Sequence, residues 1–125
     1  MCHVRHACHA TDERGKGHLM SLARERAVAA LVLMNLALQL FDGVATYVGV
    51  QHAGFAEGNP ILQWAFGYLG PASALCLFKI EASVCVLLLW RMRWSRLAAP
   101  ALALSAAVYA LCSFGPWTAA LAGLI

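Results

Sequence analysis

The chain has 125 residues, of which 62% are hydrophobic and 12% are charged, and its formal net charge is +3. Soluble domains carry charge on about a quarter of their residues, so this composition indicates a small, single-domain membrane protein. Five basic residues precede the first apolar segment, and three more share one short loop at residues 91–96. This distribution is typical of membrane topology and gives no patch for a nucleic-acid partner.

Residues 1–27 are polar and lack apolar periodicity, which predicts a disordered cytoplasmic tail before a membrane domain at residues 28–125. Met20 begins MSLARERAVAAL, an ordinary start for a membrane helix, so residues 1–19 are either a tail or lie before the true start. The spacing of the first His and Cys residues matches neither a zinc motif nor a haem-attachment motif. We therefore expect no cofactor and no metal, and keep only weak metal-ligand candidates: Cys2, His3, His6, Cys8 and His9.

Three apolar segments, at about residues 28–50, 71–90 and 98–122, predict an all-α protein with three transmembrane helices. The first segment would be roughly 35 Å long at 1.5 Å per residue, enough to cross a hydrocarbon core of ~30 Å. In the loop that follows, Asn59-Pro60 predicts a helix N-cap and first residue, and then a short interfacial helix over residues 61–66. Gly67 and Gly70-Pro71 are expected to end it, and Pro116 to kink the third span.

The loop charges predict the orientation of the chain in a cytoplasmic membrane. The N-terminal segment and the loop at residues 91–96 are basic, whereas residues 51–70 contain no Lys or Arg. Basic loops stay on the cytoplasmic side, so the N-terminus is expected inside and the C-terminus outside.

The first predicted span carries polar residues on one narrow stripe. At 100° per residue, positions 35, 39, 42 and 46 fall within a 60° sector of the helix, and they hold Asn35, Gln39, Asp42 and Thr46. An acid at bilayer depth costs about 2.5–3.5 kcal/mol on insertion scales, so Asp42 is expected to face protein or water.

The second predicted span supplies a base for this acid. Counted from the span centres, Lys79 and Asp42 lie at nearly the same depth on antiparallel helices, which makes them natural partners. Glu57 in the outer loop, beside Asn59, is a second candidate acid for Lys79, and Tyr109 could donate a hydrogen bond to either acid.

Glu81 points elsewhere, because it lies 200° around the helix from Lys79. We expect it to be covered by the third span or by another subunit, and the second option predicts a homo-oligomer. A protonated Glu81 facing lipid is the alternative.

These residues resemble those of a family of small prokaryotic membrane proteins, domain of unknown function 5658 (DUF5658). The matching features are Asn35, Asp42-x3-Thr46, Glu57-x-Asn59-Pro60, Lys79, a basic loop and a third span. The resemblance covers about residues 28–115, and it implies a three-helix membrane protein without implying an activity. The His- and Cys-rich start, Glu81 and residues 116–125 depart from the pattern.

Three functions remain open from the sequence. The first is a structural or accessory subunit, in which the polar cluster ties the helices, and it requires the fewest additional assumptions. An ion, proton or small-molecule transporter or channel subunit using Asp42, Glu57 and Lys79 would need oligomerisation, because three helices cannot enclose a path. An intramembrane enzyme is disfavoured, since the sequence has no G-x-S-x-G, H-E-x-x-H or Walker-type motif. The expected partners are the bilayer and either further copies of the chain or another membrane protein.

Overall fold

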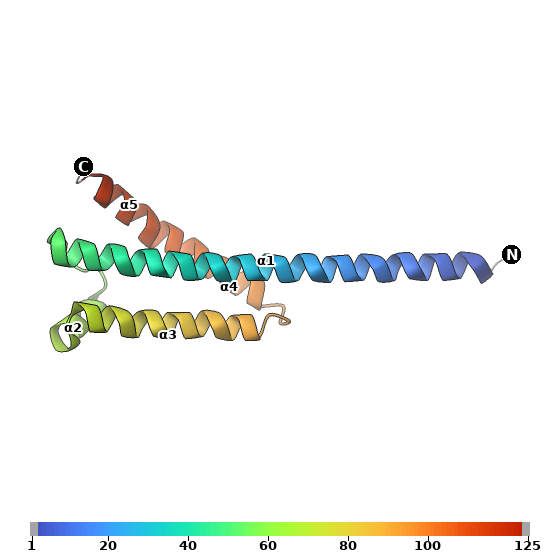
Figure 1. The fold of residues 1–125 in the computed structure, drawn as a ribbon, viewed down its shortest axis with the longest axis horizontal. Coiled ribbons are helices and arrows are strands. Elements are labelled where there is room, and N and C mark those ends of the chain that lie inside the picture. The colour runs from blue at the N-terminus through green and yellow to red at the C-terminus, as the bar shows by residue number, and fades with distance from the viewer. Residues whose placement is uncertain (1–2, 124–125) are drawn as a thin grey trace.

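The longest element, α1, is one unbroken helix from His3 to His52 (Figure 1). The computed structural model describes the backbone of residues 3–123 and the side chains of residues 12–123. The polar segment before residue 28 is therefore helical from His3, where the sequence predicted disorder. Good helix formers such as Leu, Met, Arg and Glu let the apolar helix propagate into this segment, and an exposed Asp12–Lys16 ion pair supports it at i,i+4.

Two further helical segments pack on α1 and complete the all-helical fold of the described residues (Figure 1). Helix α3 (Pro71–Arg91) lies antiparallel to α1, and the third segment returns alongside it as α4 (Ala98–Tyr109), η1 (Ala110–Phe114) and α5 (Gly115–Ala122). The three helical stretches Asp12–His52, Pro71–Arg91 and Ala98–Ala122 are long and apolar enough to cross a membrane.

The third segment diverges from α3 as it runs toward the C-terminus. Within the described range, α3 has close backbone neighbours in α1, α2 and α4 but none in η1 or α5. One core cluster lies at the α4 end, where Val28, Val32, Val86 and Leu102 are buried together. A second cluster packs α2 against the start of α3 and contains Leu62, Ala65, Ala74 and Leu75. The opposite end of the bundle is left open between α3 and α5.

The connection between α1 and α3 contains the short helix α2 (Pro60–Leu69). Asn59 is its N-cap, because its Oδ1 accepts a hydrogen bond of 3.0 Å from the amide of Ile61, and Pro60 is its first residue as expected. The helix runs three residues past Phe66, so Gly67 does not end it. It ends at Gly70, the other predicted break, whose φ of 81° is strained for any residue with a Cβ.

A π-helical turn interrupts the third segment just before Pro116. Proline has no N–H to donate back into the preceding turn, and the amide of Gly115 bonds the carbonyl of Ala110, five residues earlier. The irregularity expected at Pro116 is thus a change of helical pitch over residues 110–114. Such turns rotate the side chains that follow relative to a continuous α-helix.

Candidate functional site

The polar stripe of α1 faces the other two helical segments. Asn35, Gln39 and Thr46 are almost completely buried, and the side chain of Asp42 retains 18% of its exposure. The residues repeat at helical spacing, so each one meets a neighbouring helix at a different height along α1.

Asn35 ties α1 to α4 inside the core. Its amide nitrogen donates to the carbonyl of Leu31, one turn earlier, at 2.8 Å, and to that of Leu102 at 2.9 Å. The amide oxygen of Asn35 is buried without a hydrogen-bond partner. An unsatisfied buried oxygen costs about 1–3 kcal/mol, so this contact is not optimised for stability alone.

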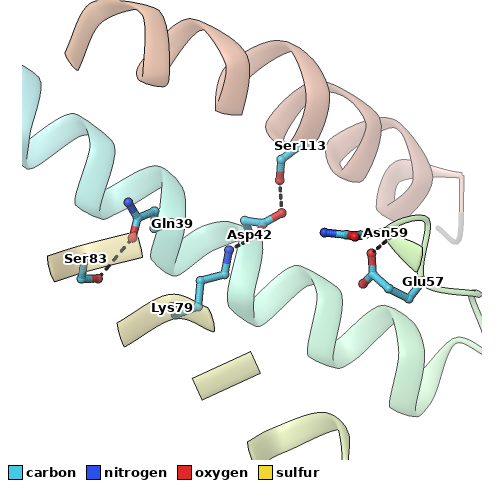
Figure 2. A network of polar contacts seen from close by, with 7 residues as sticks. All are labelled: Gln39, Asp42, Glu57, Asn59, Lys79, Ser83 and Ser113. Atoms are coloured by element: carbon cyan, nitrogen blue, oxygen red, sulfur yellow. Dashed lines mark hydrogen bonds and ion pairs between the residues drawn. The ribbon is translucent and has the colours of Figure 1, made fainter. Parts of the chain in front are cut away.

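Gln39 and Asp42 tie α1 to α3. The hydroxyl of Ser83 donates to Oε1 of Gln39 at 3.1 Å, and the ammonium of Lys79 donates to Oδ2 of Asp42 (Figure 2). The structure therefore brings together the acid and base whose depths matched in the sequence. Lys79 keeps 24% of its side-chain exposure, so the pair lies at the edge of an opening.

Asp42 has a second partner that the sequence did not suggest. Ser113 of η1 donates its hydroxyl to Oδ1 of Asp42, so the two carboxylate oxygens hold two different helical segments (Figure 2). Ser113 follows Tyr109 by four residues, which places both side chains on one helix face. This spacing is the one sequence signal that could have identified Ser113 as a candidate partner of Asp42. The π-helical turn that sets its direction could not be located from that spacing.

Tyr109 approaches Lys79 with its ring and not with its hydroxyl. The ammonium lies 5.3 Å from the ring centroid, a cation–π distance. Among the described residues, the Tyr109 hydroxyl hydrogen-bonds neither Asp42 nor Glu57, which differs from the expected role.

A groove of about 790 Å³ opens beside this network, between α1, α3, the third segment and the loop before α2. Its polar and ionisable lining comes from all four of these parts: Asp42, Thr46, Glu57, Asn59, Lys79, Glu81, Cys85, Tyr109 and Cys112. A smaller, mainly apolar groove of about 390 Å³ lies between α1 and α3, and Lys79 also borders it. The larger groove occupies the region where α5 diverges from α3.

Glu57 belongs to this groove but does not reach Lys79. Its Oε1 accepts a hydrogen bond of 2.9 Å from the amide of Asn59, while its Oε2 is buried without a partner. Figure 2 shows Glu57 and Asn59 together at the loop, apart from the Lys79 side chain. Lys79 therefore pairs with one acid, Asp42, of the two that the sequence offered.

Glu81 is exposed and borders the same groove. The third span leaves it exposed, and within the described range neither η1 nor α5 has close backbone neighbours in α3. Lys79 borders both grooves, and Glu81 borders only the larger, so the two residues share one opening although they start from different faces of α3.

The N-terminal metal candidates lie outside the described part: Cys2 in its entirety, and the side chains of His3, His6, Cys8 and His9. Between residues 12 and 123, no three His, Cys, Asp or Glu side chains are grouped so as to hold a metal ion.

The fold and this site define a class: an all-α chain with three helices able to span a membrane and a polar network where they meet. The chain belongs to the family described as domain of unknown function (DUF5658), whose model matches residues 31–115. That range contains the whole polar stripe, the groove acids and Lys79. No curated protein and no solved structure matches the chain.

Proposed function

We propose that this protein is a small integral membrane protein with a structural or accessory role, held together by the polar stripe of α1. The observation that carries the proposal is the double engagement of Asp42, which accepts from Lys79 of α3 and from Ser113 of η1. One side chain of α1 thereby holds two other helical segments in place, as expected of a residue that stabilises the packing of a membrane subunit.

The expected free energies indicate that the Asp42–Lys79 contact stabilises the packing of α1 against α3. An intramembrane hydrogen bond contributes about 0.6 kcal/mol on average, but a charge left without its partner costs several times more. Asp42 and Lys79 are 18% and 24% exposed, so we expect losses of about 1–3 kcal/mol on removal of either, below the 3–5 kcal/mol of fully buried pairs.

The test uses Asp42→Asn, Lys79→Met and the double variant in membranes, with the folded fraction measured after mild detergent extraction. Each single change should lower that fraction and the double should recover part of it, because no charge is then left alone. Asp12→Asn and Lys16→Met are matched controls, since they form an ion pair with 63% and 69% exposed side chains, and they should have little effect. Equal folding of all variants would contradict the structural role.

We also propose that the chain lies in the cytoplasmic membrane with its N-terminus inside. The basic loop at residues 92–97 is joined to α1 by Arg24, which donates to the carbonyl of Ser95 at 2.8 Å. The loop before α2 and the C-terminal end of α5 are both found at the opposite end of the helices (Figure 1). Reporter fusions at the two termini should place them on opposite sides of the membrane, and fusions on the same side would contradict this orientation.

An oligomer, or a complex with another membrane protein, is part of the same proposal. Glu81 supports it, because an exposed acid in the middle of α3 would otherwise face lipid or water. Cross-linking in native membranes between copies carrying a single cysteine at position 81 tests for the homo-oligomer, and a strictly monomeric protein leaves the partner protein as the remaining form of the proposal.

A second candidate is a subunit that conducts an ion, a proton or a small molecule. The open groove with Asp42, Glu57 and Lys79 on its wall favours it. In this case Asp42→Asn should abolish flux into vesicles while assembly stays intact, whereas the structural role predicts the loss of folded protein first.

A further inference from the structure

We infer that the larger groove binds an aliphatic ammonium group, with Glu57 and Glu81 as its anionic walls. This inference goes beyond the proposed structural role, in which the contacts between helices are made by Asp42, Lys79 and Ser113 and neither glutamate is given a ligand. A free alkylamine and the headgroup of an aminophospholipid carry the same chemistry, and the experiment below separates them.

The charge of the groove points to a cation. Three of the six acids in the chain border it, whereas Lys79 is the one Lys or Arg among the residues that line it. Lys79 is already paired with Asp42. Glu57 and Glu81 are therefore left without a compensating base on the groove wall.

Glu57 provides the second, independent observation. One oxygen of its carboxylate accepts the amide of Asn59, but the other is shielded from solvent and has no hydrogen-bond partner. Burial of an unpaired carboxylate oxygen is costly. An ammonium group in the groove carries donors and a positive charge, so it would offset the charge of this carboxylate and could take the unpartnered oxygen as an acceptor once the Glu57 side chain turns toward it.

The remaining wall suits an organic cation. Phe78, Tyr109 and Trp117 line the groove, and aromatic faces attract ammonium groups. The Tyr109 ring already receives the ammonium of Lys79 at 5.3 Å. Trp117 of α5 is in contact with Phe55 of the loop before α2, with ring centroids 6.1 Å apart, so the third segment presents a second aromatic ring to the groove near this loop.

A bare metal ion fits less well than an aliphatic amine. In the part of the chain with described side chains, no three metal-ligating groups come together, and the groove volume of about 790 Å³ is that of a small-molecule site. Glu57 lies in the loop and Glu81 about ten residues into α3, so the two acids are spread along the groove. Methylene groups of an amine can cover the apolar wall between them.

Native cysteines provide a direct assay. Cys85 and Cys112 line the larger groove, whereas Cys76 lines the smaller, mainly apolar groove between α1 and α3. The full chain in phosphatidylglycerol nanodiscs would be labelled with N-ethylmaleimide, with and without diaminooctane, and each cysteine quantified by peptide mass spectrometry. Diaminooctane should slow labelling of Cys85 and Cys112 several-fold and leave Cys76 unchanged, while octanediol, its uncharged analogue, should not.

Two variants connect the protection to the acids. Glu57→Gln with Glu81→Gln should remove it, and Glu81→Gln alone, a change at an exposed position, should weaken it in protein that folds normally. Glu25→Gln, an acid outside the groove, should leave it intact. If the ligand is an aminophospholipid, nanodiscs containing phosphatidylethanolamine should protect the wild type without added amine.

The inference is overturned if neither diaminooctane nor phosphatidylethanolamine protects, or if octanediol or Mg²⁺ protects equally well. It is overturned too if Cys85 and Cys112 are inert without ligand, since the groove would then be closed. Failure here leaves the Asp42 and Lys79 folding test unaffected, because that test scores folded protein and this one scores protection within folded protein.

Discussion

Ser113 of η1 donates its hydroxyl to Asp42 of α1 across 71 residues of sequence. The contact joins the third helical segment to the first at the height where Lys79 joins the second. Because the acceptor is a carboxylate, this bond belongs to the stronger, charge-assisted class.

Ser113→Ala should lower the free energy of unfolding by about 1–2 kcal/mol, because it removes one charge-assisted donor without changing any charge. Chemical unfolding in detergent micelles measures the change. Ser105→Ala is the matched control on the same helical segment, since Ser105 makes no side-chain hydrogen bond within the described residues. Equal effects of the two substitutions would mean that the contact to Asp42 contributes nothing.

Pro116→Ala should act on the same contact from a distance. Alanine restores the N–H that proline lacks, so the turn at residues 110–114 can relax toward an α-helix and rotate Ser113 away from Asp42. We expect the effects of Pro116→Ala and Ser113→Ala on unfolding to be non-additive in a double-mutant cycle. Full additivity would show that Pro116 does not position the serine.

Two substitutions at Asn35 test how much its buried amide contributes to the free energy of unfolding. Asn35→Leu should change the free energy of unfolding by no more than about 1 kcal/mol, because it removes the buried unpaired oxygen together with the bond to Leu102. Asn35→Asp should cost about 3 kcal/mol or more, since it places an acid against two carbonyl oxygens. The two variants have opposite chemistry at one position, so comparable losses would contradict this account.

Gly49 allows α5 to approach α1. A Cβ at Gly49 would lie closer than 3.0 Å to the indole ring of Trp117, so Gly49→Ala should displace that ring and destabilise the protein by about 1–3 kcal/mol. Gly67→Ala has open space around it in α2 and should be neutral or stabilising, because alanine is the better helix former. Thermal unfolding of the two variants checks the difference, and an unaffected Gly49→Ala protein would refute the close approach.

The three apolar helices could be predicted from the sequence, with the end of the first and both limits of the other two correct to within about two residues. These helices are encoded by local features: apolar segments of membrane length, the Asn59-Pro60 cap, and the spacing of residues 35, 39, 42 and 46. Periodicity and capping preferences identify such features without knowledge of the fold. The equal depths of Asp42 and Lys79 also follow from counting along straight helices. The helical state of residues 3–27 did not follow, because propagation from a neighbouring helix overrides a weak local pattern.

Which polar groups meet is set by the way the helices pack. Lys79 pairs with Asp42 and not with Glu57, Ser113 donates to Asp42, and the Tyr109 ring contacts Lys79. These contacts depend on how the third segment crosses α1 and on the pitch of η1. The shared groove of Glu57 and Glu81 depends on the divergence of α5 from α3. These are properties of how helices pack, and no residue spacing within a single helix encodes them.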